Sequence, residues 1–169
     1  MKVPLVCGLA VLMAAAQVPN VTYAGRKAWI IKRAGTTTVT TQLRGEALTV
    51  AIHTWQVPVK AGPLVEHRPY PQCTYSQDPC SITDSIQVTL GGHKLWVGQD
   101  QLAGLGDIHY LSIAGSPAHL ELRIAGGDGA DGYDAHLIFD GDHVAERALY
   151  GIDQQHPFEV THYYYETIN

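Results

Sequence analysis

Short runs of β-branched or alternating residues, separated by turn-forming residues, most strongly restrict what this chain can fold into. Residues 36–43 read TTTVTTQL, and residues 47–57 place Leu48, Val50 and Ile52 on one face, as a half-buried strand requires. Glycine, proline, asparagine or aspartate interrupts the chain between such runs. The pattern predicts strands at 28–33, 36–43, 47–57, 85–90, 93–97, 108–113, 118–124, 133–139, 143–149 and 158–166.

Two pairs of these strands are joined by residues that favour tight hairpins. Gly91-Gly92 and Asp140–Asp142 each stand between two predicted strands. One short helix is predicted over 99–105, where Leu102 and Leu105 lie three residues apart. About eight to ten strands at this spacing predict an all-β fold, a single antiparallel β-sandwich or barrel.

Length and composition favour one globular domain. The chain has 169 residues, of which 46% are hydrophobic and 16% are charged. This hydrophobic share is too high for a disordered chain, and the charged share is too low for a coiled coil. The net charge of −5 at pH 7 lacks the basic surface that nucleic acid or an anionic membrane needs. No Gly-rich phosphate-binding loop occurs, so nucleotide chemistry is not expected.

The first 24 residues have the layout of a secretory signal peptide. Lys2 gives a short basic start, residues 3–16 are mostly apolar, and Thr22 and Ala24 are small residues where signal peptidase prefers them. The apolar run is too short for a membrane anchor, which needs about 20 residues. We therefore expect cleavage after Ala24, export to the periplasm or the extracellular space, and one all-β domain over 25–169 without a transmembrane segment.

Two cysteines, Cys73 and Cys80, remain after such a cleavage. In an oxidising compartment an even pair usually forms a disulfide, here within a proline-rich segment at 58–79. Redox pairs are normally separated by two residues, and a zinc site would need two more ligands nearby. A structural disulfide that staples a surface loop is therefore the expected role.

The most unusual segment is 126–134, which reads GGDGADGYD and matches one unit of the calcium-binding nonapeptide of parallel β-helices. Asp128, Asp131 and Asp134 would supply the hard oxygen ligands that calcium prefers. Such sites form between stacked turns, however, and this chain has one such turn only. The alternative is a tight turn, because glycine and aspartate tolerate positive φ. Calcium is thus the one cofactor that the sequence suggests, and calcium dependence is a second functional hypothesis.

Motifs for metal-dependent or nucleophilic catalysis are missing from the sequence. The nine histidines include neither a His-x-His nor an HExxH spacing, although a zinc or copper site built from distant histidines stays open. Asp134 and His136 share a strand face, as do His119 and Glu121, because side chains alternate in a strand. Such pairs are common on solvated faces. Neither a G-x-S-x-G elbow nor an S-x-x-K motif occurs, so a hydrolase with an unrecognised site is the least favoured function.

Aromatic side chains on the stapled loop offer a candidate binding surface. Tyr70 and Tyr75 lie on either side of Cys73, and ordered loops on a rigid scaffold often carry function. Tyrosine rings present a flat apolar face and a polar hydroxyl to a sugar or a protein. The first functional hypothesis is accordingly an exported, non-catalytic binding or structural domain that acts through loops on a protein or glycan partner.

Four stretches together resemble an uncharacterised family of small exported bacterial proteins. They are PQCTYS with PCS around the two cysteines, GGD leading to Tyr133, ERALY at 146–150, and Glu159 with the closing tyrosines. The resemblance runs from residue 71 to those tyrosines. It implies secretion and the disulfide, and it carries no activity.

A second likeness is an analogy of outline only. Small periplasmic lysozyme inhibitors are disulfide-stapled β domains that present a small-residue loop ending in tyrosine. Residues 130–133 (ADGY) have that outline but lack the serine of such loops. Tyr133 thereby joins Tyr70 and Tyr75 as a candidate binding residue, and inhibition of a periplasmic enzyme becomes an alternative function.

Overall fold

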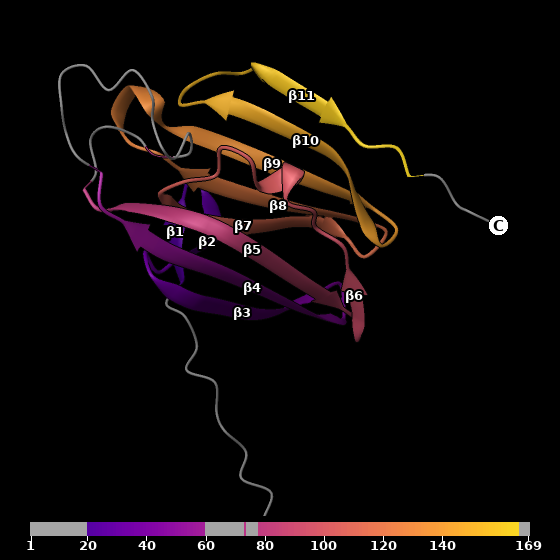
Figure 1. The fold of residues 1–169 in the computed structure, drawn as a ribbon. Coiled ribbons are helices and arrows are strands. Elements are labelled where there is room, and N and C mark those ends of the chain that lie inside the picture. The colour runs from indigo at the N-terminus through magenta and orange to yellow at the C-terminus, as the bar shows by residue number, and fades with distance from the viewer. Residues whose placement is uncertain (1–19, 60–72, 74–77, 166–169) are drawn as a thin grey trace, which may run out of the picture.

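The computed structural model describes residues 20–59, 73 and 78–165, which form eleven strands and two 3-10 turns (Figure 1). The strands are β1 Asn20–Tyr23, β2 Arg26–Ile30, β3 Gly35–Leu43, β4 Glu46–Val57, β5 Cys80–Leu90, β6 His93–Leu95, β7 Ile108–Ser116, β8 His119–Gly126, β9 Tyr133–Asp140, β10 His143–Gly151 and β11 Glu159–His162. The turns are η1 Asp100–Leu102 and η2 Gly129–Asp131. The prediction of an all-β fold is confirmed.

The strands form two antiparallel sheets that lie face to face (Figure 1). The larger sheet has seven strands in the order β1-β2-β7-β8-β9-β10-β11, and the smaller has four in the order β3-β4-β5-β6. Both predicted hairpins are present, since Leu90 pairs with His93 and Asp140 pairs with His143. Of the two predicted architectures, the structure is a sandwich.

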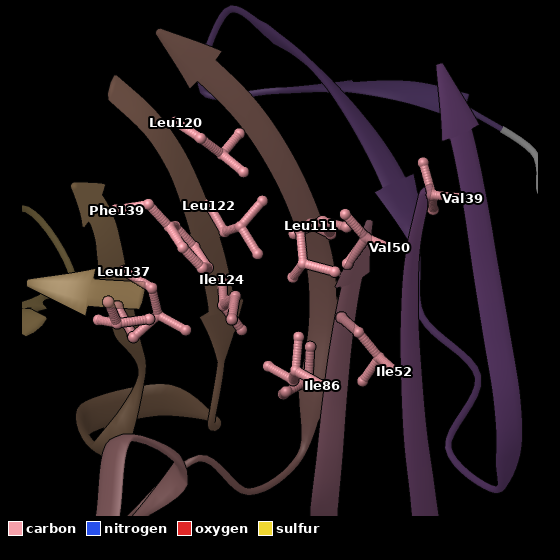
Figure 2. Close-up of a cluster of buried hydrophobic side chains, with 14 of the residues drawn as sticks. Val39, Val50, Ile52, Ile86, Leu111, Leu120, Leu122, Ile124, Leu137 and Phe139 are labelled. Carbon is pink, nitrogen blue, oxygen red and sulfur yellow. The ribbon is translucent and has the colours of Figure 1, made fainter. Parts of the chain in front are cut away.

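Alternate side chains of both sheets point into the space between them. In β8, Leu120, Leu122 and Ile124 are 0% exposed, and they belong to one cluster with Val50 and Ile52 of β4. Figure 2 shows these side chains pointing toward one another from the two sheets. Each fully buried aliphatic side chain contributes about 1.5–3 kcal/mol, so this cluster holds the sheets together and fixes which residues face outward.

The helix predicted over 99–105 is shorter than expected. Only η1 forms, with an Ala103 N–H to Asp100 carbonyl hydrogen bond of 3.3 Å. Ala103 then turns to extended backbone (ψ 127°) and Gly104 to a positive φ of 78°. A single turn is costly to extend when the following residues leave helical geometry, so the segment stays a 3-10 turn.

Strand β1 lies within the expected signal peptide. Its residues pair with β2 from Asn20–Trp29 to Tyr23–Arg26, and the Tyr23 ring stacks on Tyr110 of β7 with centroids 4.6 Å apart. Cleavage after Ala24 remains a prediction, and it would remove an edge strand of the larger sheet.

Cys73 and Cys80 form the expected disulfide, with their Cα atoms 5.6 Å apart. Cys80 begins β5 and is fully buried, and Cys73 is 4% exposed. Together with Val57 and Ile82 they make a second, small hydrophobic cluster. The disulfide therefore ties the chain that precedes β5 to the end of the smaller sheet.

Replacing both cysteines by serine should lower the free energy of unfolding by about 2.5 kcal/mol, because the eight-residue loop then regains its freedom in the unfolded chain. Chemical denaturation of the oxidised protein and of Cys73→Ser/Cys80→Ser measures the difference. Reduced wild-type protein serves as the matched control and should unfold with the variant.

Candidate functional site

A polar cluster occupies the outer face of the larger sheet. Leu122 and Ile124 of β8 point inward, so Glu121 and Arg123 point outward. The same alternation turns Asp134 and His136 of β9, and Tyr150 of β10, to this face. Antiparallel pairing places Arg123 opposite His136 and Asp134 opposite Tyr150. We call Glu121, Arg123, Asp134, His136 and Tyr150 the outer-face cluster.

Glu121 links two neighbouring strands of this cluster. Its carboxylate accepts two hydrogen bonds from Arg123, from Nε to Oε1 and from Nη2 to Oε2, both 2.8 Å. His136 Nδ1 lies 2.9 Å from Glu121 Oε1, and His136 Nε2 lies 3.6 Å from Asp134 Oδ2. The imidazole is therefore held between two carboxylates, and the ring of Tyr150 lies 4.6 Å from it.

The charged side chains of the cluster are shielded from water to a large extent. Their exposed fractions are 18% for Glu121, 20% for Arg123, 15% for His136 and 29% for Asp134. The hydrogen bond to Glu121 raises the pKa of Arg123 above its usual value. Bidentate, charge-assisted pairs of this kind fix side-chain geometry as well as charge. The cluster thus presents donors and acceptors in set positions.

A pocket of about 400 Å³ opens over the cluster. Arg123, Asp134 and His136 contribute to its lining, together with Tyr23 beside the β1–β2 turn and residues 150–154 at the end of β10. Four strands separate β1 from β10 in the sheet, so both can line one pocket only because the outer face is concave here. The volume is typical of small-molecule sites.

Two tyrosines give the pocket flat apolar surfaces. Tyr23 is held by its stack on Tyr110, and Tyr150 by its contact with His136. Burial raises the pKa of the Tyr23 hydroxyl, and the negative charge of Asp134 raises it further.

The predicted calcium ligands do not converge. Asp134 belongs to the outer-face cluster, whereas Asp128 precedes η2 and Asp131 is its last residue, whose N–H donates to the Asp128 carbonyl at 3.0 Å. Within the described part of the chain, no three His, Cys, Asp or Glu side chains gather where they could hold a metal ion.

The glycines of 126–134 serve the turn and its packing. Gly127 has a φ of +73°, and a Cβ there would lie 2.3 Å from the Asp131 carbonyl oxygen. A Cβ on Gly132 would lie 2.1 Å from the side chain of Ile152, which lines the pocket. L side chains do not fit at these positions, which accounts for the glycines there.

Of the predicted binding tyrosines, only Tyr133 lies within the described residues. Its backbone starts β9 beside the pocket, but its ring packs against the core and its hydroxyl donates to the Gly106 carbonyl at 2.8 Å. Gly126 leaves room for that ring, since a Cβ there would lie 2.4 Å from the hydroxyl oxygen. Tyr70 and Tyr75 lie outside the described residues.

The outer-face cluster was not predicted as a unit from the sequence. Strand alternation did place Asp134 with His136 on one face and Glu121 on an outer face, but such pairs alone are unremarkable. The missing information was the pairing of β8 with β9, which brings Glu121 to His136. Tyr23 was missed because its segment was assigned to the signal peptide.

Comparison with known protein families, with curated proteins and with solved structures finds no match for this chain. Among the described residues, no helix is long and apolar enough to span a membrane.

Tyr133→Phe should reduce the decrease in the free energy of unfolding that occurs at high pH. Burial raises the pKa of the folded Tyr133 hydroxyl well above its usual value, so above about pH 10 only the unfolded chain ionises there. In the wild type, the contribution of the Tyr133 hydroxyl to the free energy of unfolding is complete below that pH. It is lost as pH rises, by up to about 1.4 kcal/mol per pH unit. The variant lacks this slope and loses about 1 kcal/mol at neutral pH with its hydrogen bond.

Urea unfolding from neutral pH to about pH 11 measures both effects. Tyr164→Phe is the control, because the Tyr164 side chain is 90% exposed and the variant should follow the wild-type curve. Parallel curves for wild type and Tyr133→Phe would contradict the expectation.

Proposed function

We propose that this chain is an exported, non-catalytic domain that binds a glycan in the pocket over the outer-face cluster. The observation that carries the proposal is the combination of two tyrosine rings, Tyr23 and Tyr150, with charged groups that are already paired and held in place. Compared with the loop surface expected from the sequence, the proposed site moves to the concave face of a sheet.

A saccharide matches both the aromatic and the polar groups of this pocket. The C–H face of a pyranose ring is apolar and packs on a tyrosine ring, while its hydroxyls need donors and acceptors. Arg123 keeps N–H groups beyond the two that it donates to Glu121. Asp134 adds a carboxylate acceptor to the lining of the pocket, and Gln154 adds an amide.

Pairing within the cluster favours binding over hydrolysis. Glycosidic cleavage uses two carboxyl groups that flank the scissile bond, one of them able to give up a proton. Both oxygens of Glu121 accept hydrogen bonds from Arg123, and one of them also lies beside His136. Glu121 does not line the pocket itself, and it holds in place the Arg123 and His136 side chains that do.

Export is part of the proposal, and β1 restricts where the leader is removed. Because Tyr23 lines the pocket, a cut that preserves the site falls before Asn20. Ala14 and Ala16 supply small residues at the third and first positions before a cut after Ala16. The disulfide between Cys73 and Cys80 fits an oxidising compartment.

Tyr150→Ala should weaken glycan binding by about tenfold, because it removes one stacking surface from the pocket. Binding is first located by screening an array of neutral, acidic and amino-sugar oligosaccharides, and then measured by calorimetry. Trp55→Ala is the matched control, since Trp55 is 41% exposed on β4 of the other sheet and the variant should bind normally. No binding across the array, or equal loss in both variants, would reject the glycan site.

Secreted protein should retain strand β1. Intact-mass analysis of the protein recovered from the periplasm or medium is expected to give a mature chain that begins before Asn20, because the pairing of β1 with β2 completes the pocket. A mature chain that begins at Gly25 would contradict this and would remove Tyr23 from the proposed site.

A further inference from the structure

Among the described strands, β3 is a sheet edge that lacks the usual protection. It ends the four-stranded sheet and pairs with β4 alone among the described strands. Soluble proteins usually blunt such edges with charged residues, proline, bulges or very short strands. The nine residues of β3, GTTTVTTQL, contain no charge and no proline, and their pairing with β4 runs without a bulge.

The strands at the other three edges of the sandwich are too short to pair readily with another chain. Strand β6 has three residues, and β1 and β11 have four each. Strand β6 also carries Lys94, and β11 carries Glu159. Strand β3 is therefore the one long neutral edge among the described strands, and its outward backbone N–H and C=O groups form a template for another strand.

The sequence of β3 is nearly symmetric about Val39. Reading outward from Val39, Thr38 matches Thr40, Thr37 matches Thr41, and Thr36 faces Gln42. An interface around a two-fold axis uses the same patch on both copies, so each position must tolerate its symmetric partner. A strand with this sequence satisfies that condition with its own copy.

We propose that a second copy of this chain pairs with β3 in antiparallel register across a two-fold axis at Val39. The two four-stranded sheets then form one continuous eight-stranded sheet. Both β3 edges are consumed in the pairing, so the assembly closes as a dimer rather than extending into a fibre.

The side chains of β3 fit this register on both faces. Thr38 and Thr40 are exposed on the outer face, where they would lie opposite each other across the axis, and threonine pairs of this kind are favourable. On the inner face Val39 is 2% exposed within its own core. In the paired strands the inner faces of both copies stay on the same side of the joined sheet.

The dimer leaves the proposed glycan pocket open, because that pocket lies on the outer face of the larger sheet. Each dimer would carry two such pockets. Failure of the dimer would leave the glycan proposal intact, and failure of glycan binding would leave the dimer intact.

A charge exchange tests the register directly. In the proposed pairing, residue 38 of one copy lies opposite residue 40 of the other. Thr38→Glu/Thr40→Glu places like charges in both cross-strand pairs and should weaken the dimer by about tenfold or more. Thr38→Glu/Thr40→Lys places opposite charges in both pairs and should restore it.

Light scattering on a sizing column, from micromolar to near-millimolar protein, measures the mass of each species. The wild type and the Glu/Lys variant are expected to reach twice the monomer mass over the same concentration range, and the Glu/Glu variant only at about tenfold higher concentration or more. Gln87→Glu, at an exposed position of β5 and away from the β3 edge, is the control and should remain dimeric. Circular dichroism melts confirm folding, which these exposed positions permit.

A monomeric wild type at the highest concentration would overturn the proposal. So would the same mass for the Glu/Glu and Glu/Lys variants, since only the proposed register distinguishes them. Assemblies larger than a dimer would also overturn it, because a two-fold β3 pair has no further edge to offer.

Discussion

The packing of two inner faces against each other is the constraint on which the rest of this structure depends. Leu122 and Ile124 of β8 and Ile52 of β4 are fully buried in one cluster. Because strand side chains alternate with period two, slipping any strand by one residue would turn its apolar set to water. The core thus fixes register, and register fixes which polar residues meet on the outer faces.

The outer-face cluster is a direct consequence of that register. Arg123 and His136 lie opposite each other because the next pair along the two strands, Leu122 and Leu137, is fixed by its burial on the inner face. The charged groups can be shielded as far as they are because each has a partner: Glu121 holds both Arg123 and His136. A concave, prepaired surface of this type needs little ordering when a ligand binds, which favours affinity.

The course of most strands was predictable from residue pattern. Alternation and turn residues located β3, β4, β9 and β10 to within two residues at either end, and the cysteine pair was read correctly. The last predicted strand, 158–166, is shorter in the structure, where β11 ends at His162. Strand β1 was not predicted, since four residues after an apolar leader give too little pattern.

The sequence by itself determined the strand type, the hairpins and the disulfide, because these follow from local pattern and from the pairing of two nearby cysteines. Only the tertiary structure decided the order of strands in each sheet, because pairing between distant segments depends on how all inner faces pack at once. That order places β1 and β10 around one pocket and leaves β3 at an edge. The proposed glycan site and the proposed dimer surface both arise from it.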